Sequence, residues 1–160
     1  MEIEHRLQQM GLVLPPEPQP PPGVTVPFQW VRVHGKIAYV SGHGPQRADG
    51  TLMPSGKVGS DISPEQAYDA ARLATLAILG SLQRSLGNLD RIVAWLSVSG
   101  YIAVTPGFKR TTQVINGCSD LLLGLFGAEK GAHARTAIGV AELPLGLPVV
   151  ISAEVALTES

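Results

Sequence analysis

The chain has 160 residues, of which 44% are hydrophobic and 16% are charged, and its formal net charge is −1. The apolar content excludes an intrinsically disordered chain, and proteins that bind a nucleic-acid backbone by charge alone are normally basic. No apolar run of about 20 residues is present, so no transmembrane helix is predicted. The polar N-terminal segment MEIEHRLQQMG is unlike a signal peptide, and a single cytoplasmic domain is expected.

The N-terminal 27 residues are expected to form a leader that precedes a domain of residues 28–160. Apolar residues at helical spacing predict a short helix over residues 2–10, which Gly11 would end. Proline cannot continue a helix or occupy a central strand. Seven prolines follow, at positions 15, 16, 18, 20, 21, 22 and 27. The segment is therefore either a solvated tether or an arm that lies on a neighbouring subunit.

A hairpin and a long helix are predicted next. Two runs of strand-forming residues, 28–33 and 37–41, flank a tight turn. Residues 45–62 are rich in glycine and proline and predict a long loop. The segment Ser63-Pro64-Glu65-Gln66 then predicts a capped helix that ends near residue 86. The face of this helix that is expected to be buried consists of Ala67, Ala70, Ala71, Leu73, Ala74, Ala77, Ile78 and Leu82.

The remaining residues predict a strand, a helix and two further strands. The strand covers 92–104, the helix about 107–126, and the last strands about 134–142 and 148–157. Strands beside helices favour a layered sheet with its helices on one face. The other face would expose apolar side chains, namely Val93, Trp95, Tyr101, Val150 and Ala156. Such a face requires cover from another subunit.

Common cofactor and metal motifs are missing from the sequence. Gly42-His43-Gly44 lacks the third glycine of a dinucleotide-binding fingerprint. The four histidines do not have the spacing of metal ligands, so neither a metal nor a cofactor is expected. Cys118 falls within an apolar helix and is expected to be a core residue.

Arg135 is the residue with the clearest chemical potential. It stands at the start of an apolar strand, in HARTAIGVAEL. A guanidinium is always charged, and its planar fork of donors suits a carboxylate. The alternative is an ordinary arginine at a sheet edge, paired with a neighbouring acid. His133, two residues earlier, is expected only to shape the mouth of a cleft.

Several motifs together resemble the RidA/YjgF family of reactive imine and enamine deaminases, also labelled L-PSP endoribonucleases. The resemblance covers residues 24–158. The motifs are Gly35-Lys36-Ile37-Ala38-Tyr39-Val40-Ser41-Gly42, Gly87-Asn88-Leu89-Asp90, Val114-Ile115-Asn116 and HARTAIGVAELPLGLPVVISAEV. The leader resembles that of a longer-leader branch of the superfamily.

The resemblance implies a chorismate-mutase-like α+β fold with a mixed, mainly antiparallel sheet and two helices on one face. It also implies a homotrimer in which three sheets form a barrel and ligand clefts lie between subunits. The family needs no cofactor and hydrolyses an imine or enamine to a ketone and ammonia. By resemblance, Arg135 binds the carboxylate of a 2-imino acid. The other residues implied to lie in or near the cleft are Phe28, Ser41, Gly42 and Asn116.

Four positions depart from the family pattern. Phe28 replaces a tyrosine, Ala137 replaces a cysteine, and Val150 and Ser152 fall where the family has acidic residues. Valine cannot transfer a proton, so the usual route of water activation is missing. Positioning of a reactive imine still favours its hydrolysis.

Two other residues are candidates for acid or base chemistry. His43 stands where the family often has glutamine and titrates near neutral pH in its unperturbed state. Glu154 lies two residues beyond Ser152 and is expected on the same strand face. Each has a structural alternative, as a polar residue of the cleft wall or a charge partner.

Three functions follow from these residues. The first is a trimeric deaminase for a small carboxylated imine or enamine, and the second is a module that binds a small carboxylate without turnover. The third is a ribonuclease, which the net charge of −1 and the absence of a basic run disfavour.

Overall fold

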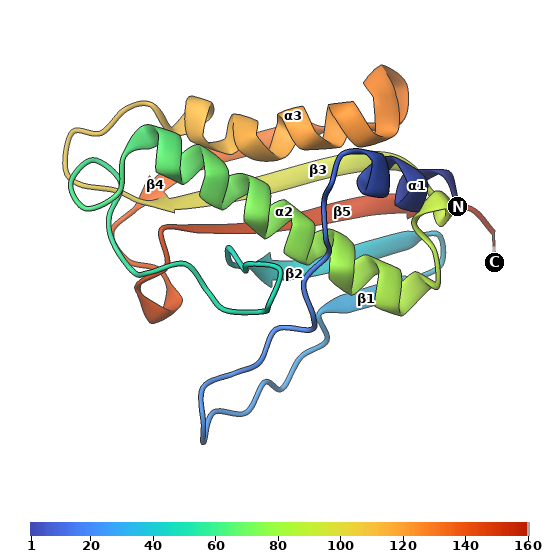
Figure 1. Cartoon of the computed structure of the whole chain (residues 1–160), viewed down its shortest axis with the longest axis horizontal. Coiled ribbons are helices and arrows are strands. Elements are labelled where there is room, and N and C mark those ends of the chain that lie inside the picture. Colours follow the sequence, from blue (N-terminus) through green and yellow to red (C-terminus); the bar gives the residue numbers. More distant parts are fainter. Residues whose placement is uncertain (160) are drawn as a thin grey trace.

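The computed structural model describes residues 1–159 and shows an α+β fold in which helices cover one face of a five-stranded sheet (Figure 1). The elements are α1 (Glu2–Gln9), β1 (Val31–His34), β2 (Ile37–His43), α2 (Pro64–Leu86), β3 (Ile92–Ala103), α3 (Thr111–Lys130), β4 (Ala134–Val140) and β5 (Val149–Leu157). Short 3-10 turns lie at Leu89–Arg91 and Pro144–Gly146. The predicted α+β fold with a mixed, mainly antiparallel sheet is confirmed.

The sheet is mixed, with strand order β1-β2-β5-β3-β4. Only β3 and β4 are parallel, and the other neighbours pair antiparallel. α3 connects the parallel pair, as parallel strands require a crossover. β1 and β4 therefore form opposite edges of the sheet. No helix within residues 1–159 is long and apolar enough to span a bilayer.

The predicted capped helix is confirmed as α2. The Ser63 hydroxyl accepts from the Gln66 backbone N–H, and the Gln66 side chain accepts from the Ser63 N–H, which completes a capping box. The helix ends at Gly87, whose φ of +89° suits glycine. The alanines of its predicted face, with Ile78 and Leu82, are buried as predicted, whereas Leu73 is half-buried. Small side chains on this face let α3 and the sheet approach closely.

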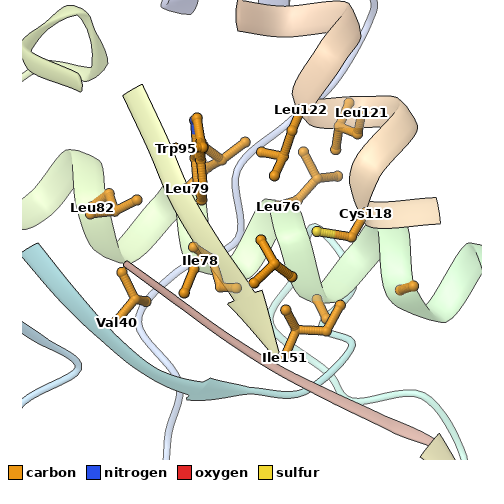
Figure 2. Packing of buried hydrophobic residues seen from close by; sticks show 14 of the residues in the cluster. Val40, Leu76, Ile78, Leu79, Leu82, Trp95, Cys118, Leu121, Leu122 and Ile151 are labelled. Carbon is orange, nitrogen blue, oxygen red and sulfur yellow. The ribbon is translucent and has the colours of Figure 1, made fainter. Parts of the chain in front are cut away.

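The core lies between the helices and the sheet. Figure 2 shows side chains of α2, α3 and the strands meeting there, with Cys118 among them. Burial raises the pKa of the Cys118 thiol to about 11, so the residue is an inert part of the core, as predicted. Trp95 also lies in the core and contacts the Phe126 ring edge-on, with centroids 5.5 Å apart.

The inward position of Trp95 corrects the predicted alternation of β3. Two irregularities in pairing with β5, near Ala94 and between Trp95 and Ser97, shift the register. A one-residue bulge exchanges the two faces of a strand. Leu96, expected inside, is consequently 39% exposed, whereas Trp95 is 2% exposed.

The helix expected to begin near residue 107 begins later, at Thr111. Residues 105–108 form a turn in which the Phe108 N–H donates to the Thr105 carbonyl at 3.2 Å. Proline followed by glycine at φ +87° is the pattern of a type II turn, which delays the helix. The regular part of α3 ends near residue 126, as predicted, because Gly127 has a φ of +86°. One further helical turn then extends to Lys130.

The leader packs against the rest of the chain before it projects outward. Ile3 and Leu7 of α1 are buried in the core. The Asp90 carboxylate accepts the backbone N–H groups of Glu2 and Ile3 at 2.7 and 3.0 Å and so caps α1. After α1 the segment runs beside α2, and its proline-rich part then projects as a loop (Figure 1).

Two hydrogen bonds join this segment to the rest of its own chain. The Arg84 guanidinium of α2 donates to the Pro15 carbonyl at 3.1 Å, and the Gln46 side-chain amide donates to the Pro16 carbonyl at 3.3 Å. The first half of the proline-rich segment therefore lies on α2 of its own chain, an arrangement that neither sequence alternative included.

Close approach of α2 and α3 predicts a strong effect of a single methyl group. A Cβ at Gly117 would lie 2.1 Å from the Tyr68 carbonyl oxygen, whereas one at Gly124 in the same helix would meet nothing within 4 Å. We expect Gly117→Ala to destabilise the fold by about 1–3 kcal/mol. Gly124→Ala should stabilise it by up to about 1 kcal/mol. Urea unfolding of both variants checks this, and equal stability would contradict the packing.

Candidate functional site

Arg135 is held at the β4 edge by three oxygen atoms of α3. It pairs in register with the buried Val98 of β3, and its side chain lies on the helix-covered face. One terminal nitrogen, Nη1, donates to Asn116 Oδ1 at 2.8 Å and to Ser119 Oγ at 3.0 Å. The other, Nη2, donates to the Thr112 carbonyl at 3.3 Å. Asn116 was predicted at this site, and the structure brings it to Arg135.

The two side-chain acceptors share one face of α3. Asn116 and Ser119 are three residues apart, a spacing that aligns side chains along a helix, and the Thr112 backbone carbonyl lies one turn before Asn116. The sequence reasoning missed Ser119. Its spacing of three residues from Asn116 was the available signal.

The charge of Arg135 has no counter-ion among residues 1–159. None of the ion pairs in this part of the chain, at 4.0 Å or less, includes Arg135. A guanidinium has five N–H donors, and three are used here, which leaves two. Two donors are what a carboxylate needs for bidentate binding. Chemically, the arrangement can bind a small carboxylate.

The other predicted binding residues lie at the opposite edge of the sheet. The Ser41 hydroxyl donates to the Gln29 carbonyl at 2.7 Å, and Phe28 packs edge-on against Trp30. Phe28 is 51% exposed. Gly42 lies beside Val150, since a Cβ there would come within 2.9 Å of Val150 Cγ1.

One chain therefore holds the predicted binding residues in two separate groups. Arg135 and Asn116 form one group, and Phe28, Ser41 and Gly42 form the other. β5 and β3 lie between β2 and β4. The distance across the sheet from β2 to β4 is therefore three strand spacings, or about 14 Å. A small ligand cannot contact both groups within a single chain.

His43 is buried, with 1% of its surface exposed, and both ring nitrogens are engaged. The Ser41 carbonyl, 2.6 Å from Nδ1, can only accept, so Nδ1 carries the proton. Nε2 then accepts from the Ser81 hydroxyl at 2.7 Å. Burial lowers the pKa of His43 to about 4, so the ring is neutral at pH 7. No ring nitrogen is left for a substrate, in contrast to the predicted acid or base.

Glu154 lies on the face of the sheet that the helices leave open. It is exposed and pairs in register with Tyr39 of β2 and Ser97 of β3. Glu154 and Ser152 line one small cavity on this face. The Arg135 side chain lies on the other face, so a single chain does not bring Glu154 to it. No group of three or more His, Cys, Asp or Glu residues in the described chain is placed to hold a metal ion.

Comparisons with known proteins reveal the family. A family model described as "YjgF/chorismate mutase-like, putative endoribonuclease" matches residues 4–154. The chain belongs to the YjgF family. Protein TCP17 of Trypanosoma cruzi is 35% identical over 155 residues, which cover 97% of this chain and 94% of TCP17.

Two solved structures extend the match over the leader. Atu1372 of Agrobacterium tumefaciens, a protein of unknown function, has 33% identity and a TM-score of 0.86 over 98% of this chain and 92% of its own. A "putative endoribonuclease" of Shewanella oneidensis MR-1 has 29% identity and a TM-score of 0.88 over 98% of this chain and 100% of its own. Because each match covers 98% of this chain, both alignments include most of the leader.

The low pKa of His43 predicts a pH dependence of stability. Its imidazole titrates near 6.5 when unfolded and near 4 when folded, so the unfolded state binds the proton first as the pH falls. The contribution of neutral His43 to the free energy of unfolding is therefore complete above pH 6.5. It falls by about 3 kcal/mol as the pH decreases to 4.

We expect His43→Gln to remove this part of the pH dependence, because glutamine offers a donor and an acceptor but does not titrate. Urea unfolding at several pH values between 7 and 4 compares the variant with the wild type. Equal losses of stability in the two proteins would contradict the assignment of His43 as a buried neutral imidazole.

Proposed function

We propose that the protein hydrolyses a small carboxylated imine or enamine to a ketone and ammonia, with the substrate carboxylate bound by Arg135. The observation that carries the proposal is a half-buried guanidinium, oriented by three neutral acceptors, that keeps two donors free. Bidentate binding of a carboxylate to such a group gives both affinity and orientation. The reaction itself comes from the RidA resemblance.

The proposed cleft needs two copies of the chain, because Arg135 lies about 14 Å across the sheet from Ser41 and Gly42. In a homotrimer, the β4 edge of one subunit would face the β1–β2 edge of the next. Apolar side chains that are exposed in the single chain support such an assembly, namely Tyr39, Val93, Leu96 and Ile138. Their burial would stabilise it by the hydrophobic effect.

The proposed reaction adds water to the carbon of the C=N bond and then expels ammonia from the resulting carbinolamine. Arg135 would hold the carboxylate next to that carbon and so fix the face that water attacks. Val150, which stands where the family has a glutamate, cannot assist proton transfer. A missing general base typically costs about 10²–10⁴-fold in rate, so we expect modest turnover of a reactive substrate.

Binding of a small carboxylate without turnover is the second candidate. Two observations support it. Both nitrogens of His43 are occupied by internal partners, and Glu154 lies on the opposite face of the sheet from the Arg135 side chain. A ribonuclease is the third candidate, and the net charge of −1 gives it no general attraction to RNA.

The deaminase proposal is tested with freshly generated 2-iminopropanoate. We expect the wild type to release ammonia and pyruvate faster than the uncatalysed reaction. Arg135→Ala should lower kcat/KM about 100-fold or more, because two charge-assisted hydrogen bonds are lost. Arg47→Ala, which removes an exposed arginine of the long loop, is the matched control and should behave as the wild type.

Other outcomes separate the candidates. Pyruvate binding that depends on Arg135, without ammonia release from this or larger 2-imino acids, would replace the deaminase with the binding module. RNA cleavage that persists in repurified Arg135→Ala would favour the ribonuclease. Turnover that is equal in the wild type and Arg135→Ala would contradict the assigned role of Arg135.

A further inference from the structure

A second layer of hydrogen bonds lies behind Arg135. The Ser119 hydroxyl oxygen, which accepts from Arg135 at 3.0 Å, is also 2.8 Å from Nε2 of His133. The other ring nitrogen, Nδ1, is 2.7 Å from the Gly131 carbonyl oxygen. Arg135, Ser119, His133 and the Gly131 carbonyl therefore form one continuous chain of contacts.

The partners fix the direction of each hydrogen bond in this chain. A carbonyl oxygen can only accept, so Nδ1 of His133 is protonated and donates to Gly131. When the ring carries this single proton, Nε2 is an acceptor and the Ser119 hydroxyl donates to it. Because the hydroxyl proton points at His133, the Ser119 lone pairs are available to the Arg135 N–H.

The series of hydrogen bonds from Arg135 ends at the Gly131 carbonyl, which belongs to a rigid piece of backbone. Gly131 is buried at the end of α3, and its N–H donates to the Gly127 carbonyl at 2.9 Å. A Cβ at Gly131 would lie 2.7 Å from the carbonyl oxygens of Gly127 and Leu122, so only glycine fits without a shift. The carbonyl that orients His133 is thus fixed by close packing.

The hydrogen-bond partners of Arg135 are neutral, and this preserves the charge of its guanidinium. A carboxylate at position 119 would also accept from the guanidinium, but it would neutralise the charge that attracts an anionic ligand. A serine whose proton is directed away orients the guanidinium and leaves its charge uncompensated. Asn116 contributes a second neutral acceptor at 2.8 Å.

We infer that His133 is a positioning residue, which acts through Ser119 to hold the Arg135 guanidinium with its two free donors directed at the ligand. This inference rests on the proposed function for the identity of the ligand, a small carboxylate. His133 itself has no free nitrogen for the ligand, since both are used within the chain. Its effect on binding therefore comes through the arginine.

The test uses two isosteric replacements of His133. Glutamine places an acceptor near the position of Nε2 and so retains the hydrogen bond from Ser119. Asparagine is shorter and places its amide near Nδ1, so the Ser119 hydroxyl loses its acceptor. We expect His133→Asn and Ser119→Ala each to weaken pyruvate binding about 5- to 10-fold, the effect of about one ordinary hydrogen bond. His133→Gln should remain within about 2-fold of the wild type.

A double-mutant cycle separates a relay from two independent contacts. If His133 acts through Ser119, the double variant Ser119→Ala/His133→Asn should bind pyruvate as Ser119→Ala does. Exposed His5 of α1 gives the control, and His5→Asn should leave affinity unchanged. Additive losses in the double variant, or a His133→Gln affinity as low as that of His133→Asn, would overturn the inference.

A ligand-free measurement keeps this inference distinct from the proposed function. We expect the Arg135 side-chain N–H signals in NMR spectra to exchange with water at least about 5-fold faster in Ser119→Ala and His133→Asn than in the wild type, because the guanidinium loses its anchor. Pyruvate binding that is unaffected by Arg135→Ala would refute the proposed function. Unchanged exchange in both variants would refute the relay, whatever the ligand proves to be.

Discussion

The guanidinium of Arg135 carries a full positive charge at a half-buried position, where loss of water is costly unless polar groups replace it. Oxygen atoms of Thr112, Asn116 and Ser119 provide that replacement. All three are neutral, so they orient the cation without cancelling its charge. A nearby Asp or Glu would have made a more common ion pair and would have cancelled the positive charge. The proposed carboxylate binding depends on this choice of acceptors.

The sheet topology explains why Arg135 lies apart from the other predicted binding residues. The β3–α3–β4 unit places the acceptors of α3 directly over the edge strand that carries Arg135. The same topology sends the β1–β2 hairpin, with Ser41 and Gly42, to the opposite edge. The helices cover one face of the sheet, and the other face exposes apolar side chains. Association of copies through that face and those edges would bury the apolar surface and complete the cleft together.

Local rules predicted much of this architecture from the sequence. Capping chemistry located the start of α2, and the positive φ of Gly87 matches the predicted end. The alternation of β3 failed because bulges arise from pairing with β5, which the sequence of one strand does not encode. The site shows the same division. The family resemblance placed Asn116 in or near the cleft of Arg135, but it did not predict their hydrogen bond. The burial of His43 was not predicted, because it depends on contacts with Ser81 from a distant helix.

The claim that one ligand contacts residues from both edges of the sheet is tested most directly by titrating isotope-labelled protein with pyruvate. NMR signals of the Arg135 Nε–H and the Gly42 backbone N–H report on the two groups separately. We predict that both signals move with the same midpoint and that Arg135→Ala abolishes both changes. A response of Arg135 without any response of Gly42 would contradict a cleft shared between subunits, and a response of Gly42 that survives Arg135→Ala would contradict the arginine as the carboxylate anchor.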